Sequence, residues 1–473
     1  MLDAGSEKTS YKELLLRALF LYLAVSADSS GEMPYMKFAG SIVFLFLCVS
    51  LMPLHSNAQG KDQPEVQSTS QSIPAPTTAY TLPPDKLAKS KALYELRGKL
   101  LIIDTVYSII LLLALLYLGI AAKYRDWAES VSKYRFVQAV IFVPLLLLTI
   151  TALSLPLDAY QHSISLRYGL SVQSWGSWFA DLVKGQGVTL VFAIPILWIL
   201  TILIRKSPRR WWFYSWIVVS ILFVFGIFIT PVLIDPLFNK FEPLEKTNPQ
   251  LVTDIEKVTE RGGLKIPRDR MFLMKASEKV TTLNAYVTGF GSSKRVVVWD
   301  NTIQKANTPE TLFVFGHEMG HYVLNHIVIG MTATVMGLLL GFYLLFVISR
   351  WTFSRFQQRW HMRDLSDWAA LPMLFLIFSI LSTISQPIGS TVSRQLEHNA
   401  DVYGLEVTHG INANSQEAGA HSFQTLGELS LSYPYPSKFV VFWFYDHPPI
   451  SDRVRFAHEY DPWSKGGQPK YVR

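Results

Sequence analysis

The chain has 473 residues, of which 50% are hydrophobic and only 17% are charged, against about 25% charged residues in a typical soluble domain. This composition excludes a disordered chain, a collagen and a disulfide scaffold. The net charge of +7 is modest for the length, and the basic residues cluster beside apolar runs, so a membrane protein is favoured over a nucleic-acid-binding protein. The single cysteine, Cys48, excludes an intrachain disulfide and a cysteine metal site, so any metal must be held by His, Asp or Glu.

The beginning of the chain contains a second candidate start at Met36. From there a basic residue precedes an apolar core at 42–52 and a small residue, Ala58, which is the arrangement of a secretory signal peptide cleaved after Ala58. Residues 1–35 would then be an over-long gene start. We interpret residues 1–58 as a mis-called start followed by the signal peptide. The alternative is an anchor helix that is not cleaved.

A segment rich in Gln, Ser, Thr and Pro follows over residues 59–98. Such a segment cannot bury enough apolar surface to offset the entropy lost on ordering its backbone. We therefore expect a tether between the signal peptide and the membrane region.

Six later stretches are apolar enough to cross a bilayer, whose hydrocarbon core of about 30 Å needs about 20 helical residues. They are 101–122, 136–156, 186–204, 211–234, 327–349 and 369–390. Four of these stretches form a membrane block at 99–234 and two form another at 327–390. Between the blocks lies a segment of soluble character, 235–326, and after them a last segment, 391–473.

Lys and Arg gather in three of the loops between the predicted spans. The first, third and fifth loops each hold four of these residues, whereas the second loop, 157–185, holds only Arg167 and Lys184. Cytoplasmic loops carry the excess of Lys and Arg, so we predict that the three basic loops face the cytoplasm. The signal peptide gives the same orientation, and segments 235–326 and 391–473 are then extracytoplasmic.

The strongest motif in the chain is His317-Glu318-Met319-Gly320-His321, an H-E-x-x-H. Residues four apart lie on one face of a helix, so His317 and His321 can both bind one Zn²⁺. Glu318 is then placed to take a proton from a zinc-activated water and return it to the leaving amine. The alternative is a helix with two surface histidines, because the bare motif also arises by chance.

Helix signals precede this motif. Thr308 can cap a helix, Pro309 suits the first turn, and Glu310 favours the positive end of the helix dipole. The spacing predicts that the helix then continues over residues 312–326.

A candidate third ligand follows the last predicted span. Glu397 is a suitable carboxylate, and Asp401 lies four residues on, where it can accept the second ring N–H of a ligating histidine and fix its tautomer. The alternatives are a solvated acidic face and His447 as the third ligand.

Two further segments suggest a substrate cleft. Residues 282–291 and 294–299 predict two strands around a glycine turn, and an exposed strand edge can hold an extended peptide; the alternative is a purely structural hairpin. His447-Pro448-Pro449 and Arg453 follow an aromatic run, and an imidazole or a cation there can stabilise an oxyanion; the alternative is a turn with a surface arginine.

Taken together, these residues resemble the integral-membrane zinc metalloproteases that include the type I CAAX prenyl protease and related bacterial membrane peptidases, over about residues 95–460. The matching residues are Tyr168-Gly169-Leu170 with Asp181, the run 234–244, Asn284-Ala285-Tyr286, His317-Glu318 through His321 with Asn325-His326, Glu397 with Asp401, and His447-Pro448-Pro449 with Arg453.

The resemblance implies a role for each matched residue. One zinc ion would be bound by His317, His321 and Glu397, with Glu318 as the base. Asn284, with Ala285 and Tyr286, would hold the substrate backbone, and His447 with Arg453 would line the cleft and stabilise the oxyanion.

The resemblance also implies a fold and an activity. The expected fold is mainly α, a polytopic barrel of transmembrane helices around a water-filled chamber, with a small α+β zincin-like metalloprotease domain at one end. The expected activity is zinc-dependent endoproteolysis of membrane-associated or misfolded proteins, in a bacterial inner membrane and without nucleic acid. The alternatives are CAAX-type processing of C-termini and a non-proteolytic membrane scaffold that contains zinc. The family has seven spans, and in the eukaryotic enzyme the zinc faces the cytosol, whereas the charges here place it outside.

Overall fold

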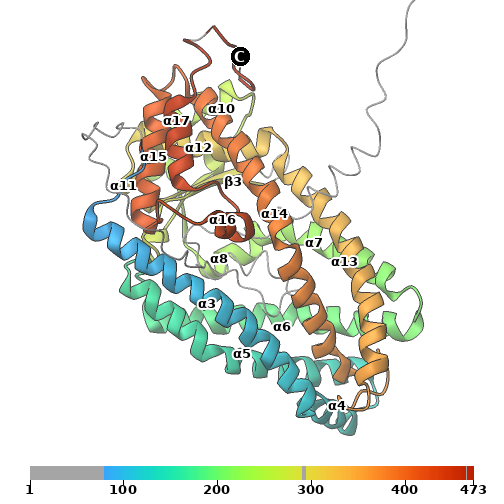
Figure 1. The fold of residues 1–473 in the computed structure, drawn as a ribbon. Helices are drawn as coiled ribbons and strands as arrows, with labels where there is room; N and C mark the ends of the chain where they lie inside the picture. Colours follow the sequence, from blue (N-terminus) through green and yellow to red (C-terminus); the bar gives the residue numbers. More distant parts are fainter. Residues whose placement is uncertain (1–78, 290–293, 465, 473) are drawn as a thin grey trace, which may run out of the picture.

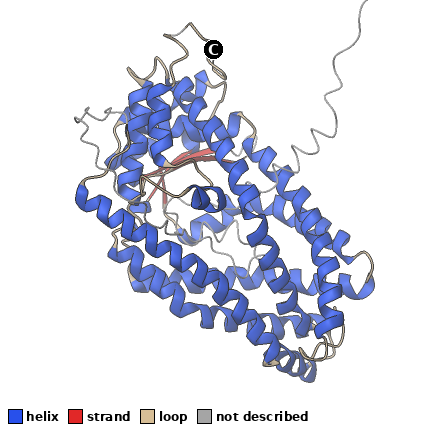
Figure 2. Ribbon diagram, viewed as in Figure 1, coloured by secondary structure: helices blue, strands red, loops and turns tan. Residues whose placement is uncertain are grey.

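The computed structural model describes residues 79–289, 294–464 and 466–472; the predicted signal peptide and residues 59–78 of the predicted tether lie outside these ranges. The described part is mostly helical with one small sheet (Figure 2). Its longer helices are α3 (Pro84–Tyr117), α4 (Ile120–Val131), α5 (Arg135–Arg167), α6 (Trp175–Lys206), α7 (Trp211–Ile229), α10 (Pro249–Arg261), α12 (Thr308–Val323), α13 (His326–Phe356), α14 (Leu371–Thr408), α15 (Ser415–Ser430) and α17 (Ile450–Glu459). Its shorter ones are α8 (Asp235–Phe238), α9 (Leu244–Thr247), α11 (Asp300–Lys305) and α16 (Lys438–Phe444).

Six helices of the described part are long and apolar enough to cross a membrane. They are α3, α5, α6, α13, α7 with its continuation to Phe238, and α14 with the short turn that begins at Trp368. Five of them contain one predicted apolar stretch completely, and the first stretch, 101–122, extends past the end of α3 at Tyr117. The prediction of six spans after the tether is confirmed. Several of these helices are longer than the predicted stretches, and their additional residues include many polar ones.

The predicted tether is too long at its C-terminal end. Helix α3 already begins at Pro84, so residues 84–98 are helical. A proline suits the first turn, and α3 is held by an ion pair in which Nζ of Lys86 lies 2.9 Å from Oε2 of Glu428 in α15. Leu93 is fully buried. Residues 84–98 are mostly Lys, Ala, Leu and Glu, which favour a helix, so the tether was extended into a segment whose local sequence already indicates one.

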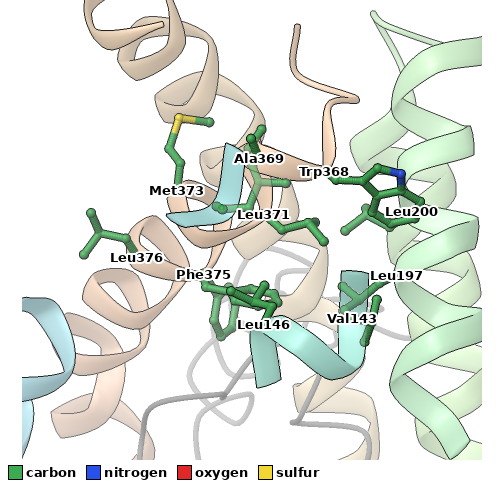
Figure 3. Packing of buried hydrophobic residues seen from close by; sticks show 14 of the residues in the cluster. Val143, Leu146, Leu197, Leu200, Trp368, Ala369, Leu371, Met373, Phe375 and Leu376 are labelled. Carbon is green, nitrogen blue, oxygen red and sulfur yellow. The ribbon is translucent and has the colours of Figure 1, made fainter. Parts of the chain in front are cut away.

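The long helices surround the interior of the molecule, with the sheet, α10, α12, α15 and α17 at one end and α4 at the other (Figure 1). Helix α14 is the most central of the six candidate spans: 67% of its apolar window is buried, against 17% for α7. In lipid, such packing is stabilised mainly by van der Waals contact between close-fitting side chains. Figure 3 shows part of this core, with Val143 and Leu146 of α5, Leu197 and Leu200 of α6, and Leu371 and Phe375 of α14.

The sheet has four strands in the order β1 (Phe241–Pro243), β2 (Met271–Met274), β4 (Arg295–Trp299) and β3 (Ala285–Thr288). Strands β2 and β4 are parallel and the other pairs are antiparallel. The two predicted strands are therefore confirmed as the β3–β4 pair, although most of their predicted turn lies outside the described residues. Gly289 at the end of β3 has φ +91°, a backbone conformation that favours glycine. Strand β3 is at the edge of the sheet, beside α12.

Candidate metal centre and active site

Helix α12 begins and ends at different residues from those predicted. Asn307, not Thr308, is the N-cap: its side chain accepts a hydrogen bond of 2.9 Å from the Glu310 N–H, and the Glu310 carboxylate accepts one of 3.3 Å from the Asn307 N–H. Thr308 is already helical, so the cap lies one residue earlier. The helix ends at Val323, because Asn325 adopts a left-handed conformation with φ 57° that breaks it before α13.

Two glycines allow α12 and α14 to approach closely. A Cβ atom on Gly404 of α14 would lie 3.0 Å from the backbone N of His317, and one on Gly316 of α12 would lie 2.8 Å from Cγ1 of Val407. Both distances are too short for an ordinary contact, so a side chain at either position would push the helices apart. The close approach places the carboxylate of Glu397 opposite the two histidines of α12.

The side chains of His317, His321 and Glu397 form a compact group that can hold one metal ion. The Nε2 atoms of His317 and His321 lie 3.2 Å apart. The carboxylate oxygens of Glu397 lie 3.2 Å from Nε2 of His317 and 3.3 Å from Nε2 of His321. Ligand atoms about 2.0–2.1 Å from a tetrahedral Zn²⁺ are separated by about 3.3 Å. In the described part of the chain, the buried Oε2 of Glu397 accepts no hydrogen bond. The group therefore fits zinc in its atoms, its spacing and its unsatisfied oxygen.

A buried ion pair lies behind the first histidine. Nδ1 of His317 is 2.8 Å from Oδ1 of Asp401, and the guanidinium of Arg453 in α17 donates hydrogen bonds of 2.9 and 2.6 Å to the same carboxylate. Burial disfavours a charged His317, but the carboxylates of Asp401 and Glu397 outweigh it and raise its pKa to about 9. The pocket around His317 thus favours a positive charge, as a metal site does.

Arg453 is itself fully enclosed. Burial opposes its charge, but the contacts with Asp401 raise the pKa of Arg453 above its ordinary value. Its guanidinium also lies 4.2 Å from the ring centroid of Phe423. The structure therefore brings Arg453 to Asp401, which orients His317.

His447 also lies at this group. Its Nε2 is 3.2 Å from Oε2 of Glu397, and its Nδ1 is 2.9 Å from Oδ1 of the buried Asp446. His447 is not a member of the compact His-His-Glu group. The alternative in which it replaces Glu397 as third ligand is therefore not supported by the geometry.

Two neighbours of the site were not predicted to have a role. Asp446 orients His447, and its position next to His447 in the chain was the signal available. Nδ1 of the buried His326 lies 3.1 Å from Nδ1 of His321. That contact depends on the sharp turn at Asn325, and no spacing rule for a continuous helix predicts it.

The predicted substrate-binding residues lie where β3 begins. The backbone of Asn284 is fixed by Thr302, whose Oγ1 accepts a hydrogen bond of 2.9 Å from the Asn284 N–H and donates one of 2.7 Å to its carbonyl. Ala285 is buried and Tyr286 partly buried in the edge strand. Glu318 is half-buried on α12, next to His317.

The fold and this site define a membrane-embedded zinc metallopeptidase. A family model described as Peptidase family M48 matches residues 245–461, and one described as CAAX prenyl protease N-terminal, five membrane helices, matches residues 63–240. The chain belongs to the M48 family and is a zinc metalloprotease with several helical membrane spans.

Individual proteins show the same relationship. "Uncharacterized metalloprotease YhfN" of Bacillus subtilis is 35% identical over 397 residues, which cover 84% of this chain and 90% of that protein. CAAX prenyl protease 1 of Saccharomyces cerevisiae is 29% identical over 335 residues, which cover 67% of this chain and 71% of the yeast protein. The crystal structure of S. mikatae Ste24p superposes with a TM-score of 0.70 at 22% identity, over 96% of this chain and 100% of that one, and so shares the fold.

Proposed function

We propose that this chain is an endopeptidase in which His317, His321 and Glu397 hold the zinc ion and Glu318 is the general base. The observation that supports this most directly is the group of two imidazoles and one carboxylate, which two helices bring within ligand spacing. Zinc bound there would act as a Lewis acid toward the attacking water and the substrate carbonyl.

The side chains of this protein then have distinct tasks. Glu318 takes one proton from the attacking water as the new C–O bond forms, and delivers it to the amide nitrogen as the C–N bond breaks. Asp446 holds Nδ1 of His447, so Nε2 points toward the metal group, where it can stabilise a developing oxyanion. Arg453 was predicted to stabilise the oxyanion; we propose instead that it is a positioning residue, because its guanidinium donates two hydrogen bonds to Asp401, which orients His317.

Substrates are proposed to be membrane-associated or misfolded chains that bind in an extended form. Strand β3 is the edge strand of the sheet among the described residues and lies beside α12. Main-chain hydrogen bonds to an edge strand hold peptides without regard to sequence. Processing of C-termini is the second candidate, favoured by the names of the CAAX prenyl protease relatives. A silent zinc scaffold is disfavoured, since a structural site needs no general base such as Glu318.

We further propose that the zinc site is extracytoplasmic. The first and fifth loops, both basic, meet at the end of the molecule that contains α4, where Arg363 contacts Glu129 at 2.6 Å and Arg125 contacts Asp367 at 2.7 Å. The positive-inside rule makes that end cytoplasmic, and the metal group lies toward the other end. A reporter fused after Arg473 should be active only outside the cytoplasm; activity in the cytoplasm would reverse this orientation.

The decisive test of the mechanism is Glu318→Gln. The variant should bind one equivalent of zinc yet cleave a quenched peptide at least about 10²-fold more slowly, as expected when a general base is lost. Glu417→Gln, on the exposed surface of α15, is the matched control and should retain activity. Full cleavage by Glu318→Gln would refute Glu318 as the base.

A further inference from the structure

Two sequence motifs that have no task in the proposed mechanism meet at one buried lysine, Lys279. They are the turn at 168–170 with Asp181, and the run at 234–244. Nζ of Lys279 lies 2.6 Å from Oδ2 of Asp181 in α6 and donates a hydrogen bond of 2.7 Å to the carbonyl of Phe238, where α8 ends. Lys279 therefore connects two of the membrane-spanning segments to the stretch of chain that precedes β3.

The ion pair of Lys279 and Asp181 is enclosed. Both residues are 9% exposed, and Oδ2 of Asp181 also accepts a hydrogen bond of 2.7 Å from Nε2 of the buried Gln173. The more exposed Lys184 is a second, more distant cation, at 3.6 Å from Oδ1. Burial lowers the pKa of Lys279, and the hydrogen bond with Asp181 opposes this effect. Since a buried charge is costly without a partner, the pair fixes both side chains in one arrangement.

The backbone of the same stretch is bonded to the loop between α5 and α6. The N–H of Val172 donates a hydrogen bond of 2.9 Å to the carbonyl of Lys279, and the N–H of Thr281 donates one of 3.3 Å to the carbonyl of Leu170. The two segments thus form a short antiparallel bridge. Gly169, with φ +71°, allows the loop to turn into this position.

Helix α11 fixes the other side of this stretch. Nδ2 of Asn301 donates a hydrogen bond of 2.7 Å to the carbonyl of Val280, and Nζ of Lys305 donates one of 2.6 Å to the carbonyl of Thr281. The residues between Lys279 and β3 are therefore held between a membrane loop and α11.

These residues lead directly into the proposed peptide-binding edge. Asn284 follows Lys279 by five residues, and β3 begins one residue later. Leu170 of the loop, Thr282 of the stretch before β3 and His447 line the same cavity of about 100 Å³. A displacement of this stretch would therefore move the start of β3 relative to the metal group on α12 and α14.

We propose that Lys279 is a positioning residue for the substrate: through Asp181 and the carbonyl of Phe238, it fixes the peptide-binding edge at its place beside the metal group. The proposal rests on the proposed proteolytic function and deepens it. Because Lys279 and Asp181 lie on neither α12 nor α14, the pair should act on how a peptide binds and leave zinc binding intact. The membrane helices then contribute to substrate binding as well as to anchoring.

Peptide binding to the inactive Glu318→Gln form tests this without relying on catalysis. In that form, Lys279→Met should bind a fluorescein-labelled extended peptide about 10-fold more weakly, as expected for the loss of one or two main-chain hydrogen bonds, and should retain one equivalent of zinc. Lys257→Met is the matched control, because it removes an exposed lysine from an ion pair of 2.7 Å with Asp254, and should leave the affinity unchanged. Unchanged affinity in a folded Lys279→Met protein would overturn the proposal, whether or not the wild-type protein cleaves peptides.

A double variant separates positioning from stability. Lys279→Met alone takes the nearer cation from the buried Asp181, whereas Asp181→Leu combined with Lys279→Met removes both charges and should restore folding. If the pair positions the edge, the folded double variant should still bind peptide about 10-fold more weakly, and Lys279→Arg alone should bind more tightly than Lys279→Met. Wild-type affinity in the double variant would show that the pair only stabilises the fold, and would overturn the proposal.

Hydrogen exchange shows where the double variant is disturbed. Fragments that cover residues 279–288 should exchange faster than in the parent protein, whereas those that cover α12 should be unchanged. Faster exchange in α12 would place the disturbance at the metal group and contradict the assignment.

The active enzyme provides a kinetic test. The double variant should have a raised KM for a quenched peptide, with kcat within about twofold of the wild-type value, because binding of the substrate and of the transition state weaken together. A lower kcat at an unchanged KM would mean that the pair acts on the chemical step, and would exclude the positioning role while leaving the proteolytic mechanism intact.

Discussion

Helix α14 has a buried arginine–aspartate pair near each of its ends. Just before its first residue, Nη1 of Arg125 lies 2.7 Å from Oδ2 of Asp367; near its last turn, Nη2 of Arg453 lies 2.6 Å from Oδ1 of Asp401. The four side chains are between 1% and 6% exposed. By distance and burial alone, the two pairs are almost the same.

Their other contacts differ. The Asp367 carboxylate accepts hydrogen bonds from the backbone N–H groups of Arg363 and Ala369, at 2.9 and 3.1 Å, so it fixes a loop. The Asp401 carboxylate instead lies 2.8 Å from a ring nitrogen of His317. We therefore predict that the ion pair is structural at one end of α14 and linked to zinc binding at the other. Matched substitutions at the two ends should separate stability from zinc binding.

The largest effect is expected at the metal group itself. Glu397→Ala removes a carboxylate ligand and should lower both bound zinc and activity by about 10³-fold or more, because zinc activation of water is lost. Metal content by mass spectrometry and cleavage of a quenched peptide measure this. The Arg125–Asp367 pair is intact in the Glu397→Ala variant and should stabilise the membrane fold. The variant should therefore elute as a single species. A full equivalent of tightly bound zinc would exclude Glu397 as a ligand.

The structural pair should show the opposite pattern. Arg125→Met leaves the buried Asp367 without its partner and should destabilise the fold by about 3–5 kcal/mol, with no change in the zinc affinity of the folded fraction. Denaturation in detergent measures the loss, and Arg355→Met, on the exposed surface, serves as control. If Arg125→Met lost zinc while its free energy of unfolding stayed unchanged, the Arg125–Asp367 pair could not be called structural in contrast to the Arg453–Asp401 pair.

Asp401→Asn tests the pair that faces the metal. It preserves the shape of the side chain but removes the charge behind His317, so zinc affinity should fall about 10- to 100-fold. Competition with a chelator measures this, and Asp367→Asn is the matched control at the other end. An unchanged zinc affinity in the Asp401 variant would show that both pairs are structural.

The smallest expected change tests the close approach of α12 and α14. Gly316→Ala adds a methyl group 2.8 Å from Val407 and should cost about 1 kcal/mol, with a modest loss of zinc affinity. Gly341→Ala on α13 meets no atom within 4 Å and should be neutral or slightly stabilising. Equal effects at the two positions would mean that the helices can separate without cost to the site.

The features that were predicted correctly are those that short-range sequence patterns indicate. A bilayer requires about 20 apolar residues, so the six spans could be located from composition. The four-residue spacing of His317 and His321 is a helix-face pattern, and Glu397 was proposed because a suitable carboxylate follows the last span.

The features that were missed depend on contacts between distant segments. Residues 84–98 are an exception, because their Lys, Ala, Leu and Glu residues favour a helix and the predicted tether was drawn too far along the chain. The contact between His326 and His321 follows from the left-handed turn at Asn325, which the apolar pattern does not encode.

The continuous length of α14 limits where a membrane-anchored substrate can be cut. Glu397 is the 27th residue of this helix. At about 1.5 Å per residue it stands about 39 Å from Leu371, whereas the hydrocarbon core is about 30 Å thick. If the helix is upright and the hydrocarbon core begins at Leu371, Glu397 stands about 9 Å beyond the lipid tails, the reach of about three extended residues. A membrane-anchored substrate needs a short extended segment between the lipid and its folded domain to reach the metal group. A substrate whose compact domain begins directly at the lipid surface would not be cleaved.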